Sequence, residues 1–476
     1  TVPFQSPVFH FGNPSNKTFY LNVSNKPIVS YHKSIEDVWY QTFKSANWKQ
    51  SFNRKPALTH YIFSHYKLPG LTYFQNMSYG QITSQLSCWD VFDKHKLAQN
   101  VRKYLRKSKT YSIMPKSFVL PSQAKKFKRF QESNPDTWMI DKLAHSSFGN
   151  NIKIQRSAEV NVSSKRVRVV QEYLQDTALF KSHKFDLRAY LLITSTDPLI
   201  AYVYSDGYGK LAAKNYSRPS EENKDDVGVH LTNVAQSKKV FNDTCKVFDG
   251  LERQVGFDEV VQELFFDRKQ FTNKLRKPKN LRDFRSEFDK KLQTLFQKLL
   301  VVMQKQMLKE DMKTGKTHKY PRQWYAKYGA DVMVMRDGSF KLIEVNRRAQ
   351  QGLTCSSQQK VAPKLIVDEL NLIGIPCIVD GNHVLNPAYN DNHTNQIKDL
   401  PEKYTFSIEE LKQMEKLNFD QLSEFEQRVL SQITDEQSRI GGWKRIWPNL
   451  NRKRVEDLGE QTYLNWLAHV FVKGQK

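Results

Sequence analysis

A predicted β-hairpin in the last third of the chain constrains the fold more than any other feature of this sequence. Two short runs rich in apolar residues, Asp331–Met335 and Phe340–Val345, are separated by a turn that contains Asp337-Gly338. An Asp-Gly pair between two such runs is a strong signal for a tight turn that joins antiparallel strands. The chain should therefore contain an antiparallel sheet, and the side chains along the hairpin have defined places on its two faces.

The hairpin carries polar side chains that could bind a cation together. Asp331 is expected to open the first strand, while Glu344 and Asn346 close the second at the i, i+2 spacing that puts both on one face. Magnesium is usually held by one or two carboxylates together with substrate phosphates, so this trio suits a magnesium site beside a nucleotide triphosphate. An ordinary hairpin with charged residues at its solvent-exposed ends would explain the same pattern without a metal.

A second predicted strand presents charges on one face. Lys184, Asp186 and Arg188 alternate with apolar residues, so the charged side chains share one face of the strand and the apolar ones pack behind it. Lysine and arginine can neutralise phosphoryl oxygens, and the aspartate can share a cation with them. A solvated sheet face is the alternative interpretation.

Three weaker signals could belong to the same site. Lys142 follows an apolar run and precedes a turn around Gly149, as a phosphate-facing lysine and a flexible phosphate loop would. The segment 171–174 ends a Val-rich strand whose backbone groups could pair with a purine. Residues 230–233 supply a polar cluster after an acidic stretch. Each of these signals is weak by itself.

Length and charge indicate a folded protein with a polyanionic partner. The chain has 476 residues, of which 39% are hydrophobic, which predicts two or three compact units and excludes a wholly disordered chain. No apolar run approaches the roughly 18 residues that cross a bilayer, so no transmembrane segment is expected. The 74 Lys and Arg exceed the 49 Asp and Glu and give a formal net charge of +25. This charge favours nucleic acid, an acidic protein surface or anionic lipid as a partner.

The cysteines indicate a reducing compartment. They are widely spaced and form no C-x-x-C pair, so neither a disulfide framework nor a zinc ribbon is expected; they are Cys88, Cys245, Cys355 and Cys377. The sequence begins at Thr1 rather than at Met, so a targeting segment could have preceded it, and the compartment is only weakly bounded.

The pattern along the chain predicts an ordered series of units. Apolar residues at three- and four-residue spacing predict a long amphipathic helix from about 280 to 309, which we expect to serve packing. The predicted units are an extended arm (1–35), a small N-terminal domain (36–110), a central subdomain (111–175), a larger C-terminal subdomain (176–380), and a linker with a helical tail (381–476).

In their order and spacing, these motifs resemble the tubulin tyrosine ligase-like family. The resemblance begins near Met114-Pro115-Lys116-Ser117-Phe118 and extends through Leu372-Ile373, and 441–448 is similar to a C-terminal signature of that family. It implies an α+β ATP-grasp fold, in which two α+β subdomains clamp ATP and Mg²⁺. Such enzymes phosphorylate a carboxylate and let an amine attack the acyl phosphate. The resemblance also implies tubulin as a partner, and the cytoplasm, cytoskeleton or cilium as the location, with the mitochondrion left open.

The resemblance assigns a role to each candidate residue. The expected phosphate contacts are Lys142 and Lys184, and the expected adenine hinge is Gln171, Glu172, Tyr173 and Leu174. The expected residues around the ribose and γ-phosphate are Asp186, Thr232 and Asn233. Magnesium would be bound by Asp331, Glu344 and Asn346. Arg188 would be the catalytic residue that steadies the acyl phosphate and the charge of the transition state.

Several positions depart from the family pattern. Phe148 and Asn151 stand in the phosphate loop where an arginine and a second glycine are usual. Arg347-Arg348 follows Asn346 where a Ser-Pro pair is common. Lys210 stands where an arginine is usual, and this exchange loses bidentate geometry. The resemblance therefore implies an intact metal trio within an altered clamp.

The sequence supports two main functional hypotheses. The first is an ATP- and Mg²⁺-dependent ligase that adds an amino acid, with glutamate or glycine favoured over tyrosine, to an acidic protein tail. The second is a catalytically weakened family member that acts as a basic structural subunit of a large polyanionic assembly, either a microtubule or axoneme or a ribonucleoprotein containing RNA. A simple nucleic-acid-binding module is a third reading, because the basic run 94–130 interleaves aromatic residues with lysine and arginine.

Overall fold

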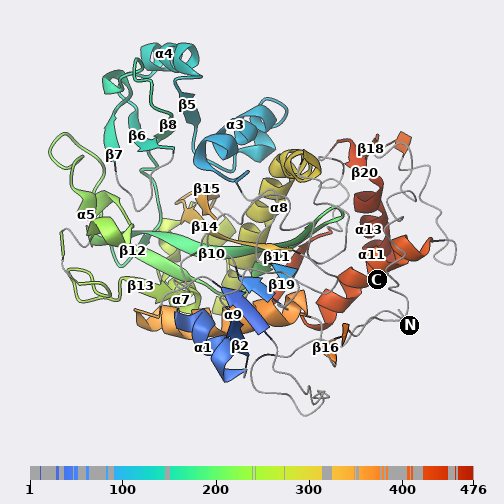
Figure 1. Cartoon of the computed structure of the whole chain (residues 1–476). Helices are drawn as coiled ribbons and strands as arrows, with labels where there is room; N and C mark the ends of the chain where they lie inside the picture. Colours follow the sequence, from blue (N-terminus) through green and yellow to red (C-terminus); the bar gives the residue numbers. More distant parts are fainter. Residues whose placement is uncertain are drawn as a thin grey trace.

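The computed structural model shows an α+β protein built around two antiparallel sheets (Figure 1). It describes residues 11, 28–31, 37–46, 48–51, 61–63, 82–83, 90–144, 151–237, 240–241, 243–272, 274–313, 324–347, 349, 353–375, 378–379, 382–383, 405–407, 409–410, 422–448, 456 and 459–474. The α+β class predicted from the sequence is confirmed.

The smaller sheet has the strand order β5-β8-β6-β7 and lies at the upper left of Figure 1. Its strands are β5 (Ser117–Leu120), β6 (Trp138–Leu143), β7 (Ile152–Arg156) and β8 (Arg168–Glu172). Helix α4 (Ala124–Ser133) buries Phe127 and Phe130 against Phe118 of β5, because its two phenylalanines are three residues apart and share one helix face. Helix α3 (Lys94–Leu105) contacts β5 and β8.

The larger sheet has eight strands arranged around one long central strand, β10 (His183–Thr196). β10 pairs antiparallel with four of the others along different parts of its length. The other strands are β9 (Leu179–Phe180), β11 (Leu199–Tyr204), β12 (Tyr208–Asn215), β13 (Gln254–Gly256), β14 (Ala326–Val334), β15 (Phe340–Asn346) and β19 (Trp443–Trp447).

Helices cover both faces of this sheet. On one side, α8 (Leu281–Lys313) and α7 (Phe257–Phe266) share a core with Leu187, Ala189 and Leu191 of β10. On the other side, Tyr190 and Leu192 share a core with α9 (Ser356–Ile373), α11 (Glu424–Ser438) and α13 (Tyr463–Gly474). Successive β10 residues thus enter opposite layers, as strand alternation requires. The long helix predicted at 280–309 is confirmed as α8.

Shorter elements complete the described part of the chain. A parallel four-stranded sheet has the order β2-β1-β3-β4, and α1 (Asp37–Ser45) packs against α9. The remaining strands are β1 (Ile28–Tyr31), β2 (Lys49–Ser51), β3 (Tyr61–Phe63), β4 (Ile82–Thr83), β16 (Ile378–Val379), β17 (Asn382–His383), β18 (Thr405–Phe406) and β20 (Gln461–Thr462). The short helices are α5 (Val227–His230), α6 (Val234–Ser237), and the 3₁₀ turns η2 (Lys109–Tyr111), η3 (Ser157–Glu159), η4 (Arg268–Gln270) and η5 (Lys274–Arg276).

Parts of both chain ends pack on the larger sheet and its helices. Phe11, in the predicted extended arm, is buried and exchanges hydrogen bonds with the side chain of Asn371 on α9. The segment 381–476, predicted as a linker and helical tail, also supplies strand β19, which pairs with β11 at the edge of the sheet. None of the helices in the described ranges combines the length and the apolar character that a membrane span requires.

Two expectations need correction. The first hairpin strand begins at Ala326, so Asp331 lies inside β14 instead of opening it. The start of this strand could not be recognised in the sequence of 326–330. The strand is buried on both faces, so its residues show no simple alternation of polar and apolar side chains. Cys245 and Cys355 form a disulfide across 110 residues of sequence, so the expectation of unpaired cysteines is wrong for this pair. Their proximity is set by tertiary packing, which spacing does not reveal.

Candidate active site

A cavity of about 680 Å³ brings all thirteen predicted site residues together. Lys142 comes from β6 and the segment 171–174 from the end of β8, both in the smaller sheet. The other residues come from β10, β14 and β15 of the larger sheet and from the loop after α5. The cavity therefore lies where the two sheets face each other. The individual roles of these residues stay predictions.

The charged residues of β10 reach the cavity because of strand alternation. Phe185 and Leu187 are buried in the core beneath α8, while Lys184, Asp186 and Arg188 line the cavity on the opposite face. Helices on that face cover β10 from Tyr190 onward. The uncovered beginning of the strand therefore forms the floor of the site, as the alternating sequence predicts.

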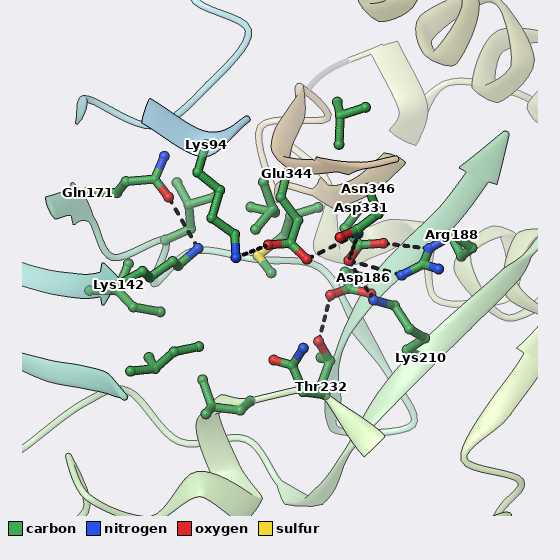
Figure 2. A pocket seen from close by; sticks show the side chains of 18 of the residues that line it. Lys94, Lys142, Gln171, Asp186, Arg188, Lys210, Thr232, Asp331, Glu344 and Asn346 are labelled. Atoms are coloured by element: carbon green, nitrogen blue, oxygen red, sulfur yellow. Dashed lines mark hydrogen bonds and ion pairs between the residues drawn. The ribbon is translucent and has the colours of Figure 1, made fainter. Parts of the chain in front are cut away.

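A buried ion network occupies the centre of the site (Figure 2). Arg188 Nε donates to Asp331 Oδ1 at 2.7 Å, and Lys210 Nζ lies 2.9 Å from both Asp186 Oδ1 and Asp331 Oδ2. Thr232 Oγ1 donates to Asp186 Oδ2 at 2.5 Å. Two carboxylates and two cations thus neutralise one another away from solvent, which offsets the cost of burying each charge.

The network shifts the pKa values of its carboxyl groups in opposite directions. Burial raises the pKa of Asp331, but Arg188 and Lys210 outweigh burial and hold it well below its usual range. Burial also raises the pKa of Asp186, where the opposing attraction of Lys210 is not sufficient to reverse it. Asp331 is therefore the strongly ionised carboxylate of the pair.

The predicted metal trio is assembled beside this network. Asn346 Nδ2 donates to Glu344 Oε1 at 3.1 Å and lies 3.5 Å from Asp331 Oδ2. Lys94 Nζ lies 3.3 Å from Glu344 Oε2. In the described part of the chain, no three His, Cys, Asp or Glu side chains form a complete metal site. Two carboxylates and an amide suit Mg²⁺, which commonly completes its shell with substrate phosphates and water.

A hydrogen-bonded relay leads from Lys184 to the loop before α5. Lys184 Nζ donates to Tyr173 Oη at 2.6 Å, Tyr173 Oη lies 2.9 Å from His230 Nδ1, and His230 Nε2 lies 3.0 Å from the carbonyl oxygen of Asn223. A protonated lysine can only donate and a carbonyl can only accept, so when Lys184 carries its proton Tyr173 donates to Nδ1 and the proton of His230 resides on Nε2. The relay fixes the position of the Lys184 ammonium.

Burial dominates the titration of both nitrogen groups in this relay. Burial lowers the pKa of Lys184 to about 7, with a further decrease from Lys142. Burial and then the charge of Lys184 lower the pKa of His230 to about 4. His230 is therefore neutral near pH 7, as its role as a hydrogen-bond acceptor requires.

In the smaller sheet, Lys142 is positioned by the predicted adenine hinge. Lys142 Nζ donates to Gln171 Oε1 at 3.2 Å, and Gln171 Nε2 donates to Ser117 Oγ at 2.9 Å. Burial lowers the pKa of Lys142, which Glu344 partly opposes. The backbone N–H groups of Glu172 and Tyr173 donate to backbone carbonyl oxygens elsewhere in the smaller-sheet region, so these bonds help to hold the hinge in place.

The predicted phosphate loop lies mostly outside the described residues, which stop at 144 and resume at 151. Asn151 has a φ of 56°, in the left-handed region. Asparagine is among the few non-glycine residues that occupy this region readily, so Asn151 can adopt the conformation that the resemblance expected of a glycine.

Among the residues that the structure describes, three lysines and arginines line the cavity but were not among the predicted site residues: Lys94, Lys210 and Arg347. Lys94 was visible only as part of the basic run, and Lys210 and Arg347 only as departures from the family pattern. Arg347 pairs with Asp93 at 3.3 Å. A lysine that faces two acidic positions across strands can be identified from sequence only when the strand register is known.

The two antiparallel sheets, facing a cavity lined with lysines and carboxylates, define an α+β protein of the ATP-grasp class. The chain belongs to the tubulin-tyrosine ligase family, whose model matches residues 74–384. The family inferred from the order of the motifs is thus confirmed.

Several curated proteins are similar to part of the chain. The tubulin polyglutamylase TTLL7 of Xenopus tropicalis is 32% identical over 154 residues, which cover 31% of this chain and 17% of that protein. The human tubulin polyglutamylase TTLL6 is 29% identical over 179 residues, covering 37% of this chain and 20% of that protein. The human tubulin monoglutamylase TTLL4 is 37% identical over 131 residues, covering 28% and 11%. The chain thus spans at most about a fifth of the length of these three relatives.

Proposed function

We propose that this protein is an ATP- and Mg²⁺-dependent ligase that adds glutamate to an acidic tail of tubulin. The observation that carries the proposal is the convergence of the lysines, the arginine and the carboxylates on one cavity between two sheets. The similar proteins are named as glutamylases of tubulin, which favours glutamate over glycine as the added amino acid. A net charge of +25 would attract an acidic tail over distances of about a Debye length.

The cavity offers distinct groups for each part of the reaction. Lys142 and Lys184 would bind phosphate oxygens, and segment 171–174 would hold the adenine. Asp331, Glu344 and Asn346 would hold Mg²⁺, which supplies Lewis-acid neutralisation of the phosphates when bound. Asp186, Thr232 and Asn233 would hold the ribose and the γ-phosphate region.

The proposed chemistry has two steps. An oxygen of the acceptor carboxylate attacks the γ-phosphorus of ATP, and the bond to the leaving ADP breaks, giving an acyl phosphate. The amine of glutamate then attacks the acyl carbon, loses a proton, and expels inorganic phosphate as the amide bond forms. Arg188 lies at the floor of the cavity, where its guanidinium can steady the charge that develops on the transferred phosphoryl group.

The location follows from the proposed substrate. An enzyme that modifies tubulin would act on the microtubule cytoskeleton or in the cilium. The structural-subunit alternative is not favoured, because all charged residues of the predicted site line one cavity. No observation on the described residues favours an RNA assembly.

The test is calorimetric titration of ATP with Mg²⁺, using the intact protein and the Glu344→Gln variant. We expect Mg²⁺-dependent binding in the intact protein that Glu344→Gln weakens strongly. Glu259→Gln, an exposed glutamate on α7, is the matched control. Radiolabelled glutamate should then be incorporated into tubulin, and radiolabelled glycine should not. Absence of binding at millimolar ATP would contradict the proposal.

A further inference from the structure

Lys210 forms a bridge between carboxylates on two different strands. On β12 it is the direct partner of Asp186 on β10, and its ammonium lies 2.9 Å from an oxygen of Asp186 and 2.9 Å from an oxygen of Asp331 on β14. The Lys210 side chain is 7% exposed, and those of the two aspartates are equally or more deeply buried. One ammonium therefore pairs with two carboxylates at once, and Arg188 supplies the second positive charge.

This bridge occupies the oxygen that a metal would need. Asp331 Oδ1 accepts from Arg188 Nε, and Asp331 Oδ2 lies 2.9 Å from Lys210 Nζ and 3.3 Å from Arg188 Nη2. A divalent cation that binds Asp331 Oδ2 is repelled by Lys210 and Arg188, because both already lie against this oxygen inside a buried site. Movement of one protein cation away from Asp331 therefore favours binding of a metal to this carboxylate.

Lys210 is the cation that can move at lower cost. Arg188 is held in place by contacts with both oxygens of Asp331, and a planar guanidinium gains from this paired geometry. The ammonium of Lys210 is a compact charge on a flexible stem, whose donors can rotate towards a new acceptor. An arginine at position 210 could form a rigid fork with the same carboxylates.

We propose that Lys210 is a resident counter-ion that exchanges with the divalent cation, moving from Asp331 to the nucleotide phosphates as metal and nucleotide bind. The proposal rests on the proposed function of this cavity. A metal that arrives alone must displace the ammonium from Asp331 and leave it with Asp186 as its one carboxylate partner. A metal that arrives with a triphosphate brings a second anion for the ammonium. Lys210 thereby makes binding of the metal conditional on binding of the nucleotide.

Binding of Mn²⁺, followed by its electron paramagnetic resonance signal, tests the exchange directly. We expect Mn²⁺ alone to bind weakly to the intact protein and more tightly with a non-hydrolysable ATP analogue, by a factor of roughly 5–150, the usual range for coupled sites. Lys210→Met should bind Mn²⁺ alone roughly tenfold more tightly than the intact protein and should lose most of the coupling. If Lys210→Met binds Mn²⁺ alone with the same affinity as the intact protein, or more weakly, the proposal is overturned.

Two further variants separate this role from general damage to the fold. Lys214→Met removes another lysine of β12, which pairs with Asp226 and does not line the cavity, and it should behave as the intact protein does. Lys210→Arg keeps the charge and should bind Mn²⁺ alone no more tightly than the intact protein. If Lys210→Met does not fold, tighter binding of Mn²⁺ alone by Lys210→Arg would still overturn the proposal.

The same measurements distinguish this proposal from the proposed function. If the intact protein shows no nucleotide binding, the ligase proposal fails, whereas Mn²⁺ binding without nucleotide still reports on Lys210. Thermal unfolding gives a second readout that does not depend on activity. Lys210→Met should unfold at a lower temperature without metal, because two buried carboxylates lose their shared counter-ion. Mn²⁺ should raise the unfolding temperature of Lys210→Met by more than it raises that of Lys214→Met.

Discussion

Arg188 on β10 and Asp331 on β14 face each other as direct strand partners, and Arg188 Nε lies 2.7 Å from Asp331 Oδ1. The pair joins the proposed catalytic arginine to the proposed metal carboxylate through the ladder of the larger sheet. A shift of one residue in the strand register would move each side chain to the opposite face. The geometry of the site is therefore tied to the pairing of two strands far apart in sequence.

A double-mutant cycle on this pair should show strong coupling. Arg188→Met leaves the buried Asp331 with Lys210 as its remaining cation partner, so we expect the free energy of unfolding to fall by about 3 kcal/mol. Asp331→Asn alone should also destabilise, and the double variant should lose less than the sum of the two. Urea unfolding of all four proteins measures the coupling. Additive losses would show that the two side chains do not interact.

Protonation of His230 should destabilise the protein in acid. Its pKa is lowered from 6.5 to about 4 by burial and by Lys184, so the unfolded chain takes up a proton before the folded one as pH falls. Neutral His230 therefore makes its full contribution to the free energy of unfolding above pH 6.5. This contribution should decrease by on the order of 2 kcal/mol as the pH falls towards 4.

His230→Gln provides the comparison for this pH dependence. Glutamine can still accept a hydrogen bond from Tyr173 and donate one to the carbonyl of Asn223, but it does not titrate. Urea unfolding between pH 4 and 7 should show a smaller decrease in stability for this variant. Parallel curves for the two proteins would exclude His230 as the titrating group.

Gly207, in the turn between β11 and β12, should not tolerate a side chain. A Cβ at this position would collide with the backbone carbonyl oxygen of Arg188 and lie 2.7 Å from Cζ of Phe257. We expect Gly207→Ala to lower the free energy of unfolding by about 1–3 kcal/mol and to weaken nucleotide binding by shifting Arg188. Gly474 has open space around it, so Gly474→Ala should change stability by less than about 0.5 kcal/mol.

Loss of the Cys245–Cys355 disulfide should destabilise the folded protein. The bond closes a segment of 110 residues and ends at the residue before α9. Closing such a long segment restricts the unfolded chain, so the Cys245→Ser/Cys355→Ser variant should be about 2–4 kcal/mol less stable. Urea unfolding measures the difference. A reductant should lower the stability of the intact protein and leave the variant unchanged, and equal stability of oxidised protein and variant would contradict the expectation.

Local pattern was sufficient to predict much of the fold. The heptad-like spacing of apolar residues placed α8, the Asp-Gly pair placed the β14–β15 turn, and alternation placed Lys184, Asp186 and Arg188 on the face that lines the cavity. These features depend on interactions between residues a few positions apart. The start of β14 was missed because a strand buried on both faces lacks the alternation that marks a half-exposed one.

The sequence by itself determined the elements, the family and the residue types available for chemistry, since periodicity and motif order are properties of neighbouring positions. Only the tertiary structure decided which charges neutralise one another. Lys210 lies between Asp186 and Asp331 because β10 pairs with β12 along one edge and with β14 along the other. The disulfide likewise depends on the packing of distant segments. Such contacts follow from strand register and burial, which arise only when the whole chain has folded.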